Sequence, residues 1–275
     1  MIFYFTGTGN SLYAAGQLAG EERLIDIGEC VKNKEYHFRV EKEEKAGIVF
    51  PVYYGGLPSI VVYFLNHLEL EMEEDTYLYG VMTYGGIPGA ADRMLARCLH
   101  KRGYVLDAVY GVRMPKNYVA LYNVPDEKQS ERVNRAAKNI LAVIREKIEE
   151  KEVRKFISGP AGRAATAVMY PLYRNGRKTE YFYVDERCVG CGACANYCRA
   201  GAIEMREGRP VWIKERCIYC MGCINRCGAI QFGEKTKDRR RYVHPVLKNN
   251  PHSNQEHCSG EEKSDAKTKD GMEKA

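Results

Sequence analysis

The chain has 275 residues, 45% of them hydrophobic, and a formal net charge of +6. It is too long for one ordinary domain, it has enough apolar residues for at least one sizeable core, and its mild charge does not require nucleic acid. No apolar run reaches the roughly 18 residues of a membrane-spanning helix, and no basic segment precedes the apolar start. We therefore expect a soluble, cytoplasmic protein without a signal peptide.

The first 150 residues alternate short apolar runs with helix-like patterns. Short apolar runs suit strands that are buried on both faces of a parallel sheet. The alternation therefore predicts a doubly wound α/β domain with right-handed crossovers. The predicted strands span 2–5, 24–27, 47–52, 77–83 and 104–112. The predicted helices span 11–19, 59–67, 89–102 and 126–150, and the polar segment 28–45 has no clear pattern.

The first predicted strand leads into a glycine- and hydroxyl-rich turn, Thr6-Gly7-Thr8-Gly9-Asn10-Ser11. A strand, such a turn and a helix N-terminus form an anion site, because backbone N–H groups and the helix dipole face the ligand. A Walker A loop is excluded, since Asn10 stands where that motif has lysine. A dinucleotide fingerprint lacks its third glycine at Leu12, although Asp26 is a candidate ribose ligand. A tight turn with a good helix cap is the remaining alternative.

Two more loops follow predicted strands at the same edge of the sheet, and ligands of doubly wound folds bind at this edge. Tyrosine rings in these loops would stack on a planar ring system, and glycines would let backbone N–H groups approach its edge. The alternative for each tyrosine is an ordinary half-buried aromatic residue. The loops are Tyr53-Tyr54-Gly55-Gly56 and Thr83-Tyr84-Gly85-Gly86.

Eight of the 11 cysteines lie in two copies of the spacing C-x2-C-x2-C-x3-C. This spacing is the bacterial iron–sulfur signature, and in it three close thiolates wrap one face of a cubane cluster. Structural zinc is the alternative, but it normally takes two separated C-x2-C pairs. The first copy is Cys188, Cys191, Cys194 and Cys198, and the second is Cys217, Cys220, Cys223 and Cys227.

We divide the chain into four parts by composition. Residues 1–150 form the α/β domain, 151–179 a connector with a short helix over 164–173, and 180–234 the cysteine domain. Residues 235–275 form a basic and then charged, largely disordered tail. We expect the disorder over 249–275, because that segment cannot bury enough apolar surface. Its Arg239-Arg240-Arg241 run is interpreted as offsetting cluster charge, with nucleic-acid binding as a less favoured alternative.

These motifs resemble known families. The 6–11 turn is similar to the flavin mononucleotide (FMN) phosphate loop of flavodoxins, T-x-T-G-N-S/T, and residues 181–232 are similar to bacterial ferredoxins with two 4Fe–4S clusters. Over residues 1–242 the chain resembles the flavodoxin–ferredoxin fusion proteins of anaerobic bacteria. The resemblance implies a flavodoxin-like parallel sheet of order 2-1-3-4-5, followed by a small α+β ferredoxin-like domain.

The resemblance also implies the cofactor ligands. FMN would bind through the 6–11 turn and the two tyrosine- and glycine-containing loops. Each cluster would take three cysteines from one copy and the last from the other: Cys188, Cys191, Cys194 and Cys227 for one, and Cys217, Cys220, Cys223 and Cys198 for the second. The chain departs from the ferredoxin pattern at Arg199 and Gly228, where the family usually has proline, and in a shorter turn after Cys227.

The implied function is electron transfer between two 4Fe–4S clusters and FMN, and onward to redox protein partners. An FMN-dependent reductase of a small-molecule acceptor, fed by its own ferredoxin domain, is the main alternative. A dinucleotide-binding dehydrogenase and a nucleic-acid-binding protein with a basic tail are further alternatives. We find no acid–base pair and therefore predict no catalytic side chain.

Overall fold

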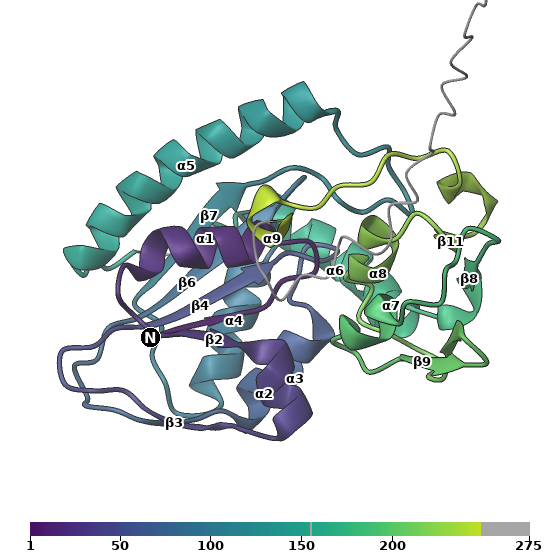
Figure 1. The fold of residues 1–275 in the computed structure, drawn as a ribbon. Helices are drawn as coiled ribbons and strands as arrows, with labels where there is room; N and C mark the ends of the chain where they lie inside the picture. The colour runs from purple at the N-terminus through teal and green to yellow at the C-terminus, as the bar shows by residue number, and fades with distance from the viewer. Residues whose placement is uncertain (155, 249–275) are drawn as a thin grey trace, which may run out of the picture.

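The computed structural model describes residues 1–154 and 156–248, and its larger part is an α/β unit around one parallel sheet (Figure 1). The strand order is β2-β1-β4-β6-β7. Counted along the chain, these five strands have the order 2-1-3-4-5, which is the flavodoxin-like order. The predicted fold class is thus confirmed. The strands are β1 (Ile2–Tyr4), β2 (Leu24–Asp26), β4 (Ala46–Pro51), β6 (Leu78–Tyr84) and β7 (Ala108–Arg113).

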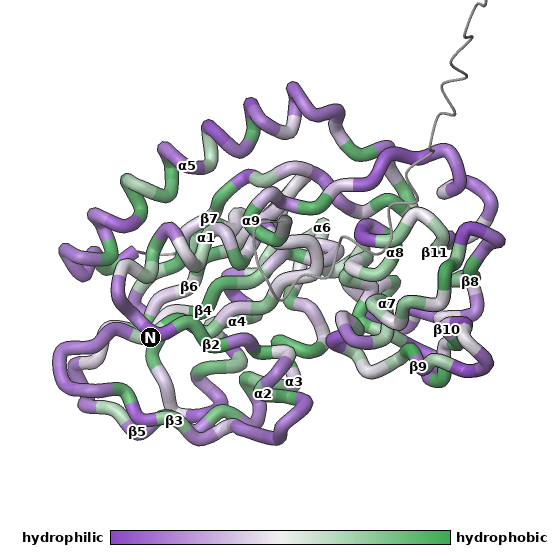
Figure 2. The backbone as a smooth tube through the Cα atoms, viewed as in Figure 1, coloured by the Kyte–Doolittle hydropathy of each residue, from purple (hydrophilic) through white to green (hydrophobic). Residues whose placement is uncertain are grey.

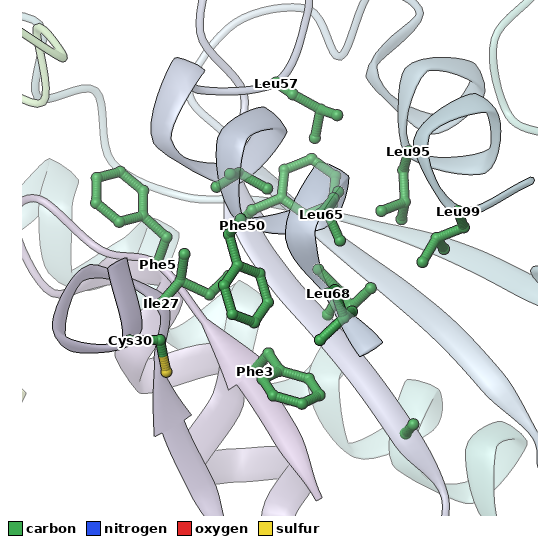
Figure 3. Packing of buried hydrophobic residues seen from close by; sticks show 14 of the residues in the cluster. Phe3, Phe5, Ile27, Cys30, Phe50, Leu57, Leu65, Leu68, Leu95 and Leu99 are labelled. Carbon is green, nitrogen blue, oxygen red and sulfur yellow. The ribbon is translucent and has the colours of Figure 1, made fainter. Parts of the chain in front are cut away.

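Helices cover both faces of this sheet. On one face, Phe3 and Phe50 pack among leucines of α3 (Ser59–His67) and α4 (Ala91–His100), as Figure 3 shows. On the other face, Ile2 and Val49 pack against α1 (Asn10–Ala19) and α5 (Glu127–Glu149). Hydrophobic residues gather in the strands, whereas much of α5 is hydrophilic (Figure 2). This two-sided burial explains why the strands are near-continuous apolar runs.

The polar segment 28–45 holds a helix and a strand. The Asp26 carboxylate accepts a hydrogen bond from Gly28 N at 2.7 Å and so caps α2 (Ile27–Asn33). Cys30 of this helix is buried in the core beside Phe5 and Ile27 (Figure 3). The strand β3 (His37–Arg39) pairs in parallel with β5 (Glu69–Glu71) outside the main sheet.

The segment 151–179 is more than a connector, because it contains the helix α6 (Pro160–Asn175). This helix is longer than the predicted 164–173. It starts with proline, whose missing N–H costs nothing in a first turn, and it continues past Pro171 to Asn175. Tyr173 on α6 is buried, so tertiary contacts stabilise a helix that its sequence specifies only weakly.

The cysteine-rich part has two small antiparallel sheets with short helices between them. One sheet pairs β8 (Phe182–Val184) with β11 (Ile230–Phe232), and the other pairs β9 (Ile203–Arg206) with β10 (Arg209–Trp212). The short helices are η1 (Thr179–Tyr181), α7 (Ala193–Asn196), α8 (Gly222–Arg226), η2 (Glu234–Thr236) and α9 (Pro245–Lys248). None of the helices in the described ranges is long and apolar enough to cross a membrane.

Residues 235–248, at the start of the predicted tail, are folded against the rest of the chain. This segment, yellow in Figure 1, runs back from the cysteine-rich part to α9 beside α1. Tyr242 and Leu247 are buried, and His244 stacks on Tyr13 of α1 with ring centres 4.3 Å apart. Three apolar or aromatic anchors in a basic stretch therefore hold the segment. The rest of the predicted tail, 249–275, lies outside the described residues.

Candidate functional site

A pocket lies at the carboxyl edge of the sheet, where the loops after β1, β4 and β6 meet. It brings together nearly all the residues predicted to bind FMN. Gly9 and Gly56 lie outside its lining, because His244 and Leu247 fill the side-chain position of Gly9, and Tyr170 and Met94 fill that of Gly56. The predicted residues that do line the pocket are Thr6, Gly7, Thr8, Asn10, Ser11, Tyr53, Tyr54, Gly55, Thr83, Tyr84, Gly85 and Gly86.

The 6–11 turn carries buried hydroxyls at one end of the pocket. Gly9 N donates to Thr6 Oγ1 at 3.0 Å, and Ser11 Oγ lies 2.8 Å from Thr83 Oγ1. Asn117 Nδ2 donates to Thr8 Oγ1. The side chains of Thr6, Thr8 and Ser11 are all buried. Hydroxyls and backbone N–H groups at the start of α1 suit a phosphate monoester, which offers several acceptor oxygens.

The two tyrosines after β4 lie in a tight turn. Tyr53 and Gly56 exchange backbone hydrogen bonds of 2.9 Å, and Tyr54 and Gly55 between them have φ of 51° and 74°. Two consecutive left-handed residues are typical of a type I′ turn, and glycine adopts this conformation without strain. The Tyr54 hydroxyl lies 2.7 Å from that of Tyr118. Burial raises the pKa of Tyr118, so its hydroxyl stays protonated.

Sequence reasoning missed the loop after β7 and the contribution of α6. The loop holds Lys116, which is the only cationic side chain among the described pocket-lining residues. Its position after the last strand of the sheet, at the same carboxyl edge, is a signal that could have found it. The helix α6 gave no such signal. The missed lining residues of these two segments are Pro115, Lys116, Asn117, Tyr118, Leu121, Tyr122, Met169 and Tyr173.

The eight clustered cysteines form two crossed sets. Cys188, Cys191, Cys194 and Cys227 line a separate cavity of about 430 Å³, and we call them the outer set. In the second set, Cys198, Cys217 and Cys220 are the electrostatic neighbours of Cys223, whose pKa burial raises; we call these four the inner set. These memberships are the ones that the resemblance to ferredoxins implies.

The spacing of the thiols differs from that of a single-ion site. Across the described ranges, no three His, Cys, Asp or Glu side chains converge to hold one metal ion. Structural zinc needs four ligands around one ion, whereas the four thiolates of a 4Fe–4S cluster are distributed over its irons. The four-thiol cavity of the outer set fits a cluster in this respect.

The inner set lies directly against the pocket. Cys220 and its neighbours Tyr219 and Met221 line the pocket together with the 6–11 turn. A side chain added at Gly7 would lie 2.4 Å from the Cys220 carbonyl oxygen, and one at Gly222 would lie 2.9 Å from Gly7 O. Glycine at both positions therefore permits the two loops to touch.

The helix α6 fixes the cysteine-rich part to the pocket. The Tyr173 hydroxyl accepts from Ser59 N at 3.0 Å and donates to Ile218 O at 2.9 Å. Arg177 Nη1 donates to Ser59 Oγ at 2.8 Å and to Cys217 O at 2.9 Å. The same two side chains thus bind the start of α3 and the loop of the inner set.

Asp26 does not serve as a ribose ligand in this arrangement. Its carboxylate caps α2 and forms an ion pair of 2.9 Å with Arg199, the residue after Cys198. Burial raises the pKa of Asp26, while the Arg199 guanidinium opposes this shift. Asp26 also lies outside the pocket lining, so the dinucleotide interpretation loses its ribose ligand.

Comparison with known proteins finds one family within the cysteine-rich part. A family model described as the 4Fe-4S binding domain matches residues 181–204. No curated protein sequence matches the chain.

Several solved structures are distantly similar to the chain. Rubredoxin oxygen:oxidoreductase of the anaerobe Desulfovibrio gigas is 16% identical, with a TM-score of 0.30, over 55% of this chain and 36% of that one. The Trp repressor binding protein of Bacillus subtilis is 11% identical, with a TM-score of 0.31, over 51% of this chain and 96% of that one. An FMN-dependent NADH-azoreductase of Bacillus anthracis, in complex with FMN, is 10% identical, with a TM-score of 0.30, over 54% and 98%.

The TM-scores are too low for these similarities to establish a fold. The strand order establishes the fold class. The chain thus combines a flavodoxin-like α/β fold with a 4Fe–4S binding domain that follows it.

Proposed function

We propose that the chain is an electron-transfer iron–sulfur flavoprotein with FMN and two 4Fe–4S clusters. The observation that carries the proposal is that Cys220 of the inner set and the 6–11 turn line the same pocket. Clusters exchange single electrons, and FMN exchanges one or two, so together they connect one-electron and two-electron partners.

Successive segments of the chain have different proposed roles. Residues 1–150 hold FMN, with the 6–11 turn at its phosphate and Tyr53, Tyr54 and Tyr84 beside its ring. Residues 180–234 hold the clusters on the inner and outer sets. Residues 151–179 and 235–248 join the two parts through α6 and α9. Their hydrogen bonds support a constant distance between the inner set and the pocket.

Cofactor analysis of the intact protein, purified without oxygen, tests the proposal. We expect iron and sulfide equivalent to two clusters and one FMN per chain. Cys220→Ser should lower the iron content by up to half, because it removes one ligand of the inner set. Cys98→Ser, on α4 and outside both sets, is the matched control and should leave iron unchanged. Full iron content in Cys220→Ser would contradict the assignment.

A second function is favoured by the mouth of the pocket. Ile87, Leu121 and Tyr122 line the pocket and are nevertheless 54%, 57% and 47% exposed. An apolar rim of this kind suits a small planar acceptor reduced at the flavin. Steady-state turnover with a quinone series, compared between the native chain and Leu121→Asp, tests this reductase activity. Turnover that Leu121→Asp leaves unchanged would exclude the rim as the acceptor site.

A further inference from the structure

Arg226 belongs to the second cysteine repeat and contacts the first. It precedes Cys227 in the second repeat, and Tyr197 precedes Cys198 at the equivalent position in the first. The Arg226 guanidinium carbon lies 4.1 Å from the centre of the Tyr197 ring. Since Cys198 belongs to the inner set and Cys227 to the outer set, this pair lies between them.

The Arg226 guanidinium has a buried N–H group that no acceptor satisfies. Its Nη2 donates to Gly7 O of the 6–11 turn at 3.4 Å, whereas its Nε is buried without a hydrogen-bond partner. Its side chain also hydrogen-bonds with that of Tyr197, and among the described residues no carboxylate forms an ion pair with it. A buried cation without an anion is strongly unfavourable, so an anionic group is expected at this place.

Other arginines near the cysteine sets differ from Arg226 in their neighbours. Arg199 pairs with Asp26 and Glu29. Arg241 has Cys227, Asp185 and Cys223 as electrostatic neighbours. Arg226 instead has Cys220 of the inner set as a neighbour. Arg226 is therefore one cation close to the inner set, and Arg177 is another, since its Nη1 donates to Cys217 O at 2.9 Å.

We propose that Arg226 is the counter-ion of the inner cluster and raises its reduction potential above that of the outer cluster. An electron added to a cluster increases its negative charge, and a nearby cation in a low-dielectric site favours the reduced form. Electrons from an external one-electron donor would then be held mainly on the inner cluster, beside the pocket. In this proposal Arg226 acts on the inner cluster through its charge. The proposal rests on the proposed function.

An EPR-monitored redox titration of the intact protein tests the role of Arg226. Arg226→Gln should lower the potential of the inner cluster by about 59 mV or more, which is a tenfold change for a one-electron couple. The outer cluster should shift less, and Cys191→Ser identifies its signal because that ligand belongs to the outer set alone. Arg206→Gln, at an exposed arginine of β9, is the matched control and should shift neither potential.

If Arg226→Gln does not assemble clusters, Arg226→Lys still tests the role of Arg226. The lysine retains the charge, so its inner cluster should stay within tenfold of the native one. A larger fall in Arg226→Lys with full iron content, or an inner-cluster potential that Arg226→Gln leaves unchanged, would overturn the inference. A native chain that yields no two cluster signals would instead overturn the proposed function.

Discussion

Arg199 Nη2 lies 2.9 Å from Asp26 Oδ2, so an ion pair joins the residue after Cys198 to the end of β2. Arg199 also contacts Glu29 of α2. The side chains of Arg199 and Asp26 are only 26% and 12% exposed, so solvent screens this pair less than a surface pair. The departure from proline at position 199 thus has a structural consequence, because arginine links the loop of Cys198 to the α/β fold.

Arg199→Gln should lower the free energy of unfolding by about 2 kcal/mol, since it leaves the Asp26 carboxylate partly buried without its cation. Denaturant unfolding of the cofactor-loaded chain measures this change. Arg206→Gln is the control, because Arg206 and Glu204 are 60% and 52% exposed and their pair should contribute below about 0.5 kcal/mol. Equal effects of the two variants would show that the Arg199 pair is an ordinary surface contact.

Gly7→Ala should weaken FMN binding by about tenfold or more, equal to roughly 1.4 kcal/mol. The added methyl group would lie 2.4 Å from a backbone oxygen of Cys220, so the turn and the inner-set loop must move apart. Equilibrium titration with FMN measures the affinity. Gly16→Ala on α1 meets no atom within 4 Å and should leave FMN binding unchanged. Native affinity in Gly7→Ala would show that the contact of the two loops is not needed.

Ser11→Ala should weaken the binding of FMN by about tenfold but leave riboflavin binding nearly unchanged. The Ser11 hydroxyl is buried in the proposed phosphate site, and riboflavin has the same ring without the phosphate. The variant also leaves the Thr83 hydroxyl without its partner. That loss affects both ligands equally, so the comparison with riboflavin separates it from the loss of the phosphate contact. An equal loss for both ligands would remove Ser11 from the phosphate site.

Acid should destabilise the protein through His244. Burial lowers the pKa of His244 to about 4, from an ordinary value of 6.5. The unfolded chain therefore binds this proton more readily, and the stability present above pH 6.5 is lost as the pH falls toward 4. The expected loss between pH 7 and pH 5 is about 2 kcal/mol.

Unfolding of the native chain at the two pH values, compared with His244→Gln, isolates this contribution. The variant should lose about 2 kcal/mol less than the native chain on acidification. His37→Gln is the control, because that side chain is 68% exposed. A native pH dependence in His244→Gln would show that other groups cause the acid sensitivity.

Patterns that repeat locally were predictable from the sequence. The helix predicted over 59–67 is α3, and the five strands lie within a few residues of their predicted ranges, because two-sided burial demands continuous apolar runs. Most of the residues predicted for FMN also meet in one pocket, since the carboxyl ends of parallel strands share an edge.

Features that depend on contacts between distant segments were not predictable. The helix α6 is stabilised by Thr166, Tyr170 and Tyr173, which bond to backbone atoms of the pocket loops and of α3. The segment 235–248 is held by isolated anchors such as Tyr242, whose hydroxyl donates to Asn10 Oδ1 at 3.0 Å. A helix over 164–173 was predicted, but its partners were not, because the sequence of neither segment reveals which distant loops it contacts.

We propose that one chain carries FMN beside two 4Fe–4S clusters, with the inner cluster against the flavin pocket. Stepwise anaerobic reduction with dithionite, followed by absorbance and EPR, tests it most directly on the protein as isolated. We predict bleaching of bound flavin together with EPR signals that add up to two clusters per chain. Cluster signals without flavin, or flavin without cluster signals, would contradict the proposed function.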